Sequence, residues 1–140
     1  MENEGLKNAN NYFTIGVFLF VFLILLDQFS KLFIEQPFYN FQFAFSLPVP
    51  QPLIYIIYIL VLGGIAYYLS RHYRQLSLFS TIAWTFILSG ALSNVGERIV
   101  LGSVRDFIYI NFYHWTGIYN LADFYIIIGI VLLLFKPNKK

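Results

Sequence analysis

The chain has 140 residues, of which 59% are hydrophobic, 21% are aromatic and 11% are charged. Soluble domains carry about 25% charged residues, so this composition indicates a membrane protein. The net charge of +2 is too small to favour nucleic-acid binding, and the absence of cysteine excludes disulfides, thiolate metal sites and a cysteine nucleophile.

Four apolar segments predict four membrane-spanning helices, at residues 12–34, 52–69, 76–94 and 117–135. Each is close to the roughly 20 residues that a helix needs to cross the hydrocarbon core of a bilayer. The first segment has too long an apolar run for a cleaved signal peptide, and no small-residue cleavage site follows it. Without an internal repeat or a low-complexity linker, residues 1–140 are interpreted as a single membrane domain. The predicted class is an all-α integral membrane protein with a small extracytoplasmic β element.

Lysine and arginine predict the orientation of the spans. If the spans alternate, six of these residues fall on one side of the membrane and three on the other. The larger group is Lys7, Arg71, Arg74, Lys136, Lys139 and Lys140, and the smaller group is Lys31, Arg98 and Arg105. Because cytoplasmic segments carry the excess of positive charge, both termini are predicted to be cytoplasmic, and the connections at 35–51 and 95–116 are predicted to face outward.

The two outward connections carry strand patterns. In "NFQFAFSL", phenylalanine and leucine alternate with polar or small residues, which is the period of two that is typical of a strand. The segment "DFIYINFY" is rich in β-branched and aromatic residues, which also favours a strand. We therefore predict a β element at residues 38–47 and 104–113, on the outer membrane surface, where aromatic side chains are favoured.

Polar residues near the ends of the first and third spans form two local groups. Asp27 and Lys31 are four residues apart, so they lie on one helical face and are interpreted as a structural ion pair at the membrane interface. Asn94, Glu97 and Arg98 share a face if the third helix continues that far, and alone they are consistent with a polar cap. The small residues that precede them, in "SGALS", predict close helix packing.

Asp106 and Asp123 are the strongest candidates for a functional site. Asp106 opens the second predicted strand, and Asp123 opens the fourth span, with Asn120 three residues before it. An ionisable group inside a membrane span is rare and by default marks a functional site. Spacing alone leaves local roles open, because a helix N-terminus favours Asp123 and because Arg98 or Arg105 can pair with Asp106.

Four segments of the chain, in this order, resemble a known family. They are "DQFSK" at 27–31, "NFQFAFS" at 40–46, "SGALSNVGERIVLGSVRDF" at 89–107 and "YNLAD" at 119–123. The chain closely resembles the bacterial lipoprotein signal peptidases, signal peptidase II. The resemblance covers nearly the whole chain, and four motifs in the right order are specific although each alone is weak.

The resemblance implies an aspartic endopeptidase that removes the signal peptide of a prolipoprotein, cutting just before a cysteine that carries diacylglycerol. Asp106 and Asp123 match the catalytic aspartates of the family. The residues that match its substrate-binding or supporting positions are Asp27, Lys31, Asn40, Asn94, Glu97, Arg98, Asn120 and Ala122.

The resemblance also implies partners and location. The expected partners are the diacylglyceryl-modified prolipoprotein, the surrounding membrane lipids and peptide inhibitors of the globomycin type. The protein is expected to be a monomer of the bacterial inner membrane, with its active site near the extracytoplasmic face and with no nucleic-acid partner. No metal or organic cofactor is expected, and His72 and His114 lie too far apart in the sequence to suggest a histidine metal site.

Two carboxylates are sufficient for this chemistry. Peptide hydrolysis needs an activated water and a proton donor for the leaving amine. Two carboxylates that share a site do not readily both ionise, so the charged one takes a proton from water while the neutral one polarises the carbonyl. Asp123, near a helix start, is the better candidate for the ionised member.

The chain departs from the family pattern at several positions. Glu97 stands where the family usually has aspartate, Gln42 where it has glycine and Phe43 where it has a small residue, and Ser89 replaces the first glycine of a Gly-Gly pair. Glu97 is expected to support the site rather than to act as nucleophile or base. The change Glu97→Asp is expected to preserve activity, because it restores the family residue.

Three other interpretations stay open from the residues alone. The chain is consistent with a pseudoenzyme, with a membrane-embedded lipoprotein-binding or assembly protein whose polar residues join helices, and with a proton or ion pathway through Asp27 and Asp123. The clustering of the acids toward one face of the membrane disfavours the pathway, and the intact Asp106 and Asp123 disfavour the pseudoenzyme. Cleavage of a lipidated substrate by the purified protein separates the enzyme from all three.

Overall fold

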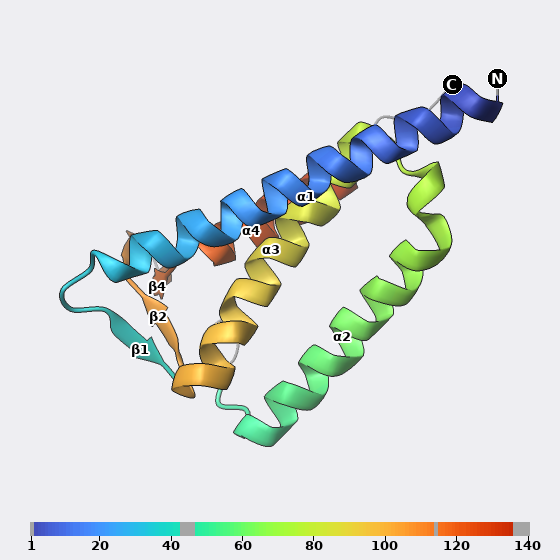
Figure 1. Ribbon diagram of the computed structural model, residues 1–140. Coiled ribbons are helices and arrows are strands. Elements are labelled where there is room, and N and C mark those ends of the chain that lie inside the picture. Colours follow the sequence, from blue (N-terminus) through green and yellow to red (C-terminus); the bar gives the residue numbers. More distant parts are fainter. Residues whose placement is uncertain (1, 43–46, 114, 136–140) are drawn as a thin grey trace.

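The chain folds into a group of helices with short strands at one end. The computed structural model describes residues 2–42, 47–113 and 115–135. The helices are α1 (Glu2–Leu32), α2 (Gln51–His72), α3 (Leu78–Leu101) and α4 (Leu121–Leu134), with a 3-10 turn, η2 (Tyr73–Gln75), between α2 and α3. The strands are β1 (Phe38–Asn40), β2 (Val104–Asp106), β3 (Ile108–Phe112) and β4 (Trp115–Tyr119). Figure 1 shows that the strands lie at the end of the molecule opposite to the start of α1.

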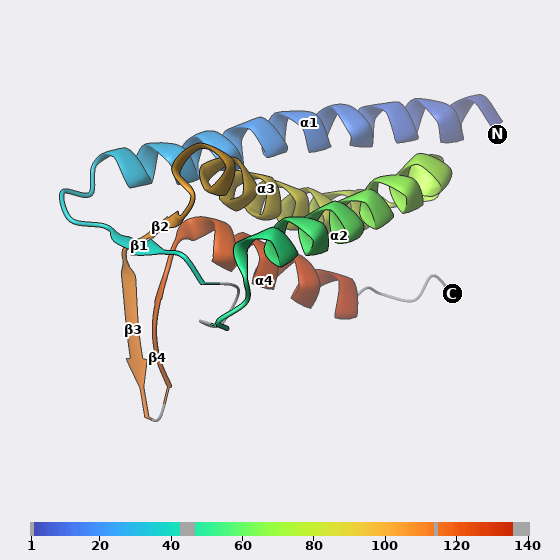
Figure 2. The same cartoon turned by 90° about the horizontal axis from the view of Figure 1, so that it is seen from below.

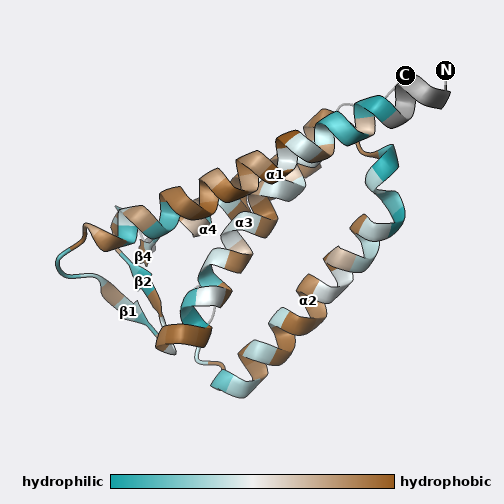
Figure 3. Cartoon of the chain, viewed as in Figure 1, coloured by the Kyte–Doolittle hydropathy of each residue, from teal (hydrophilic) through white to brown (hydrophobic). Residues whose placement is uncertain are grey.

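Three of the helices are long and apolar enough to cross a membrane. They cover Lys7–Leu32, Gln51–Gln75 and Leu78–Leu101, whereas α4 is a shorter apolar helix of 14 residues. Large apolar side chains cover the outer faces of the helices, and Phe18 of α1, for example, is 73% exposed. Figure 3 shows this apolar surface along the helices and hydrophilic residues near the start of α1 and at both ends of α2. Such a distribution is typical of helices surrounded by lipid.

Helices α3 and α4 pack closely because glycines lie where they cross. A Cβ atom on Gly90 would lie 2.3 Å from the carbonyl oxygen of Ala122, and a Cβ atom on Gly129 would lie 2.6 Å from that of Ala83. Neither position leaves room for a side chain, so the two backbones come into direct contact. Helix α1 packs along α3 on the side away from α4 (Figure 2). The first turn of α4 is therefore held firmly against α3.

Helix α2 contributes little to the core. All of its residues are described, and Ile54 is the only one that is buried. Its first turn is attached to the end of α3, because Nε2 of Gln51 donates to the carbonyl of Gly102 at 2.6 Å and the hydroxyl of Tyr55 donates to the carbonyl of Arg98 at 2.9 Å. Beyond this turn α2 diverges from α3 (Figure 1) and reconnects to it through η2.

The strands form two antiparallel pairs. β1 pairs with β2, which places Phe38 opposite Asp106 and Asn40 opposite Val104. β3 pairs with β4 along the full length of both strands. The backbone N–H of Phe107 donates to the carbonyl of Tyr119 at 2.9 Å, which brings the end of β2 to the end of β4. The residue after β2 and the last residue of β4 thus meet at one point of the fold.

The predicted class, a helical membrane protein with a small β element, is confirmed, but several predicted boundaries were wrong. The third helix continues to Leu101 instead of ending at residue 94, and α1 begins at Glu2. Residues 117–119, predicted as the start of the fourth span, belong to β4. Of the predicted strand at 38–47, Phe38–Asn40 forms β1, and residues 43–46 lie outside the described part of the chain. The predicted strand at 104–113 is two strands with different partners.

Candidate active site

Asp106 ends β2 and is almost completely buried, with 2% of its surface exposed. Its Oδ1 accepts a hydrogen bond from Nδ2 of Asn120 at 2.6 Å, and its Oδ2 accepts one from Nδ2 of Asn40 at 2.9 Å. Asn40 reaches it because the register of β1 and β2 puts the two residues diagonally across one face of the sheet. Burial raises the pKa of Asp106 to about 6, although the two amide donors act in the opposite direction.

Asp123 lies in the first turn of α4, where a capping box fixes it. Its Oδ2 accepts from the backbone N–H of Asn120 at 3.1 Å, and its own backbone N–H donates to Oδ1 of Asn120 at 3.1 Å. Its other oxygen, Oδ1, accepts from Nδ2 of Asn94 on α3 at 2.9 Å. The start of a helix carries a positive partial charge, so this position favours the carboxylate form of Asp123.

Asn120 joins the two candidate catalytic aspartates. This residue has 0% of its surface exposed. Its side-chain nitrogen bonds to Asp106, whereas its side-chain oxygen and its backbone N–H both bond to Asp123. One buried side chain therefore sets the position of both carboxyl groups relative to each other.

A third carboxylate, Asp27 of α1, holds the start of α4 from the other side. Its Oδ1 accepts from the backbone N–H of Ala122 at 3.0 Å, and its Oδ2 accepts from the hydroxyl of Ser93 and from Nζ of Lys31, both at 2.7 Å. The predicted pair of Asp27 and Lys31 thus forms, and both residues are buried inside the protein. Ala122 takes part through its backbone.

Glu97 of α3 extends this group of charges toward β2. Its Oε2 lies 2.8 Å from Nζ of Lys31, and its Oε1 accepts a hydrogen bond from Nε of Arg105. The backbone N–H of Arg105 also donates to Oε2 of Glu97 at 3.3 Å. We call Asp27, Lys31, Glu97 and Arg105 the buried ion chain. Its acids and bases alternate and are equal in number, which offsets the cost of keeping charges away from water.

Arg98 is buried next to this group and retains unused donors. Its Nη2 donates to the carbonyl of Gln42. Its Nε and Nη1 are buried and have no hydrogen-bond partner among the described residues. Buried donors are normally paired, so these two N–H groups indicate a place where a polar group of a ligand can bind.

A cavity of about 830 Å³ borders both Asp106 and Asp123. It lies between α2, α3 and α4, with β4 at one end, and most of its wall is apolar. The apolar wall includes Ile57, Val61, Leu62 and Ile65 of α2, Ile87 and Ala91 of α3, and Ile126, Ile127, Ile130 and Leu133 of α4. The polar groups in the wall include Asn40, Asn94, Arg98, Asp106 and Asp123. The cavity is therefore an apolar trough with the two aspartates among the polar groups of its wall.

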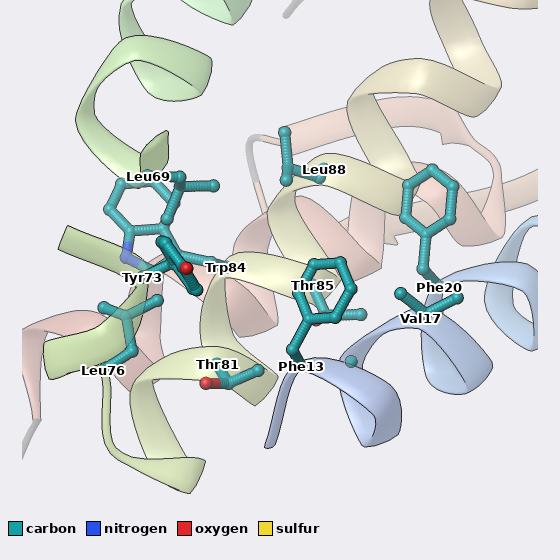
Figure 4. A pocket seen from close by; sticks show the side chains of 11 residues that line it. Phe13, Val17, Phe20, Leu69, Tyr73, Leu76, Thr81, Trp84, Thr85 and Leu88 are labelled. Atoms are coloured by element: carbon teal, nitrogen blue, oxygen red, sulfur yellow. The ribbon is translucent and has the colours of Figure 1, made fainter. Parts of the chain in front are cut away.

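A second cavity, of about 200 Å³, lies where α1, the end of α2 and α3 approach one another (Figure 4). Its lining is apolar apart from the indole of Trp84 and the hydroxyls of Tyr73, Thr81 and Thr85, and it includes no ionisable acid or base other than Tyr73. It has no group suited to hydrolysis. Among the described residues, no three histidine, aspartate or glutamate side chains are grouped so as to hold a metal ion.

A family model described as signal peptidase (SPase) II matches residues 19–137 of the chain. The chain belongs to the signal peptidase II family. Over 117 residues it is 37% identical to the lipoprotein signal peptidase of Chlamydia trachomatis serovar L2, a match that covers 82% of this chain and 69% of that protein. Over 133 residues it is 32% identical to the lipoprotein signal peptidase of Streptococcus pyogenes serotype M1, covering 81% of this chain and 86% of that protein.

The fold is also similar to solved structures. One structure of a bacterial membrane enzyme matches with a TM-score of 0.74 and 25% identity, covering 91% of this chain and 94% of that one. A second matches with a TM-score of 0.71 at the same identity. The resemblance to signal peptidase II is thus confirmed, and the family together with the apolar helices makes this a protease of a bacterial membrane.

The signal peptidase II fold brings all ten predicted site residues to one end of the molecule. They are Asp27, Lys31, Asn40, Asn94, Glu97, Arg98, Asp106, Asn120, Ala122 and Asp123. The alternative in which Asp106 pairs with Arg105 does not describe this site, because the guanidinium of Arg105 bonds to Glu97 and the carboxylate of Asp106 receives amides.

Three polar residues of the site were not predicted from the sequence. Gln28 donates to the hydroxyl of Ser93 at 2.8 Å, and Arg105 completes the buried ion chain. Ser93 had been noted only as a small residue that permits helix packing. Each of these contacts joins residues distant in the sequence or in different elements, so local spacing gave no signal for them.

Proposed function

We propose that this chain is a membrane aspartic endopeptidase that removes signal peptides from prolipoproteins, with Asp106 and Asp123 as its catalytic pair. The observation that carries this proposal is the geometry around Asn120. One buried residue bonds to both carboxyl groups, and both border the same cavity. Membership of the signal peptidase II family supports the substrate class.

The two aspartates have different surroundings, which suits the two roles that hydrolysis requires. Asp106 is buried, with a pKa raised to about 6, so it retains its proton more readily than an ordinary aspartate. Asp123 lies at a helix start and accepts two N–H donors, which favours its charged form. Asp123 is therefore the general base that takes a proton from water, and Asp106 is the acid that donates to the scissile carbonyl.

The hydrolytic step follows from these roles. The water oxygen attacks the peptide carbonyl while its proton moves to Asp123, and the proton of Asp106 moves to the carbonyl oxygen. As the tetrahedral intermediate collapses and the C–N bond breaks, Asp123 gives its proton to the leaving amine, and Asp106 takes back a proton from a hydroxyl of the intermediate, which becomes the carboxyl group of the product. Both aspartates are then in their starting states.

The cavity fits a substrate that is mostly apolar and has one peptide bond to be cut. The apolar wall of α2, α3 and α4 can receive the signal-peptide helix and the acyl chains of a diacylglyceryl-modified cysteine. The free donors of Arg98 lie near the aspartates and can bind a carbonyl of the substrate. A globomycin-type peptide inhibitor is expected to occupy the same cavity.

The charges favour an orientation with both termini in the cytoplasm and the site near the extracytoplasmic face. Lys7, Arg71 and Arg74 are exposed near the start of α1 and the end of α2. At the other end, the cations belong to the candidate site. Lys31 and Arg98 are buried there, and Arg105 is paired with Glu97. The exposed cations therefore favour the end that lacks the site as the cytoplasmic end.

Cleavage by the purified protein tests the proposal. The protein in detergent is mixed with a prolipoprotein that carries diacylglycerol on its cysteine, and with the same precursor lacking the lipid. We expect cleavage of the lipidated precursor just before the cysteine, and inhibition by a globomycin-type peptide. A folded protein that binds the lipidated precursor without cutting it would contradict the proposal and favour a pseudoenzyme.

A further inference from the structure

The buried ion chain connects the two elements that carry the proposed catalytic aspartates. At one end, Asp27 accepts the backbone N–H of Ala122, which is the residue before Asp123. At the other end, Glu97 accepts both Nε and the backbone N–H of Arg105, which is the residue before Asp106. Lys31 joins the two ends, with Nζ 2.7 Å from Asp27 and 2.8 Å from Glu97.

We propose that Glu97 and Arg105 are positioning residues for this reaction. Through Lys31 and Asp27, they hold the end of β2, which carries Asp106, in a fixed position relative to the start of α4, which carries Asp123. This inference rests on the proposed function, because it presumes that these two aspartates react together. Neither Glu97 nor Arg105 lines the cavity that the aspartates share, so both act through their neighbours.

Burial is what makes this chain of charges rigid. Asp27 and Lys31 have 0% and 1% of their surface exposed. A charge in such a place is not stably held without its partner, so each ion pair fixes the position of the element that supplies it. The pairs join α1, α3 and β2, and the carboxylate of Asp27 adds the first turn of α4. Loss of a single link would loosen one aspartate relative to the other.

The length of the Glu97 side chain matters in this arrangement. Its two oxygens serve different cations, Oε2 that of Lys31 and Oε1 that of Arg105. Aspartate is shorter by one C–C bond, about 1.5 Å, and does not span both cations from the same backbone position. Family resemblance alone predicts that Glu97→Asp is harmless, whereas the geometry predicts that it loses one of the two contacts.

The charges near Asp106 allow a measurement that a purely structural role would not affect. This measurement is the pH above which activity is lost. The charged groups on the elements packed near Asp106 are Asp123 on α4, Asp27 and Lys31 on α1, Glu97 and Arg98 on α3, and Arg105, which precedes it on β2. Arg105→Gln removes a positive charge, which should move the high-pH limit of activity upward. Glu97→Gln removes a negative charge, which should move that limit downward.

The experiment compares purified full-length variants on the lipidated prolipoprotein, with a melting curve for each. The variants are Arg105→Lys, Arg105→Gln, Glu97→Asp, Glu97→Gln and the double change Glu97→Asp with Arg105→Gln. Arg71→Gln is the matched control, because it removes an exposed cation at the opposite end of the molecule. Asp106→Asn and Asp123→Asn are measured in the same series.

We expect Arg105→Lys and Glu97→Asp to fold and to lower kcat about ten- to a hundredfold, with KM within about twofold, since a misplacement of about 1 Å has an effect of this size. The double change should cost little more than either single change, because the two residues form one link. The charge-removing variants should shift the pH limit in opposite directions, and Arg71→Gln should behave as wild type.

Wild-type kcat in folded Arg105→Lys and Glu97→Asp would overturn the inference, as would a shift of the pH limit in the same direction for Arg105→Gln and Glu97→Gln. If the charge-removing variants do not fold, the kcat of the two charge-preserving variants decides. Failure of the catalytic assignment has a different signature. Cleavage by Asp106→Asn or Asp123→Asn would refute the pair itself, whereas inactive aspartate variants beside fully active Arg105→Lys would refute the positioning role alone.

Discussion

The side-chain nitrogen of Asn120 lies 2.6 Å from Oδ1 of Asp106, and the same side chain caps the helix that begins with Leu121. Both contacts come from one amide, whose oxygen accepts the backbone N–H of Asp123. The cap and the carboxylate contact are therefore geometrically coupled. A substitution that keeps one and removes the other shows what each contributes.

Asn120→Ser separates the two contacts. Serine caps a helix about as well as asparagine but has no second polar atom to reach Asp106. We expect a melting temperature close to that of wild type and a loss of about tenfold or more in kcat, since a donor to a reacting group is removed. Asn120→Ala is the control, because it should also lose about 1 kcal/mol of stability with the cap. Equal activity of the serine variant and wild type would contradict the role of Asn120 in placing Asp106.

The proposed catalytic pair is tested by Asp106→Asn, Asp123→Asn and the double variant. The amide is nearly isosteric with the carboxyl group, so the variants should fold, but it cannot take up or release the proton. Loss of general acid–base catalysis lowers rates by about 10²–10⁴-fold. The double variant should be little worse than either single variant, because the two groups act as a unit. The measurement is cleavage of lipidated prolipoprotein by detergent-purified protein, and substantial turnover by either single variant would refute the assignment.

The raised pKa of Asp106 predicts how activity depends on pH. Its ordinary value is 3.8 and burial raises it to about 6, so the folded protein favours the protonated form. Activity that needs this proton is present below pH 6 and lost as the pH rises through about 6 in the free enzyme, which kcat/KM reports. If kcat/KM instead rose as the pH increased through this range, the required proton would belong to another group.

The same shift predicts the pH dependence of stability. Because the folded state holds this proton more tightly than the unfolded state, the contribution of Asp106 to the unfolding free energy falls as the pH rises from about 4 to about 6. The size is of the order of 3 kcal/mol. Melting curves of wild type and Asp106→Asn across this range isolate the contribution, since the asparagine variant lacks it. Parallel curves for the two proteins would contradict the shift.

The contact of Gly90 with α4 predicts a sensitive position outside the polar site. A methyl group there would lie 2.3 Å from the carbonyl oxygen of Ala122, so Gly90→Ala must push the first turn of α4 away from α3. We expect a loss of about 1–3 kcal/mol of stability and a lower kcat, because Asp123 lies in the displaced turn. Gly96→Ala on the same helix is the matched control. Nothing lies within 4 Å of its Cβ, so it should be neutral or slightly stabilising.

The orientation is tested with reporter fusions after Arg74 and after Phe112. The first position lies at the end of the helices that carries the exposed cations, and the second lies among the strands. We expect a cytoplasmic signal from the first fusion and an extracytoplasmic signal from the second. An extracytoplasmic signal after Arg74 would reverse the orientation.

The sequence predicted the helices well because apolar length alone determines them, but it placed the end of the third helix too early. From the sequence, Glu97 and Arg98 were interpreted as polar residues at the end of a membrane span. In the structure α3 passes through them to Leu101, because Lys31 and Arg105 neutralise Glu97 inside the protein. A charge that is paired within the fold does not end a membrane helix, and pairing across distant segments is invisible in local spacing.

The start of the fourth helix was misplaced for a different reason. The residues from Gly117 to Tyr119 continue an apolar run into α4, and β-branched and aromatic residues suit both a strand and a membrane helix. The capping box of Asn120 and Asp123 determines where the helix begins. The sequence contains that signal in the three-residue spacing of Asn120 and Asp123, but the apolar run extends past it on both sides and does not mark the boundary.

Helix α2 forms much of the apolar wall of the cavity yet buries only Ile54 of its own residues. We expect a wall with so little packing behind it to adjust to signal peptides of unlike length and bulk at small cost. We therefore expect discrimination between precursors at the polar end of the cavity, where hydrogen bonds and ion pairs hold the side chains. We expect such an enzyme to be selective for the lipid-modified cysteine and its neighbours and to tolerate wide variation in the hydrophobic sequence that precedes them.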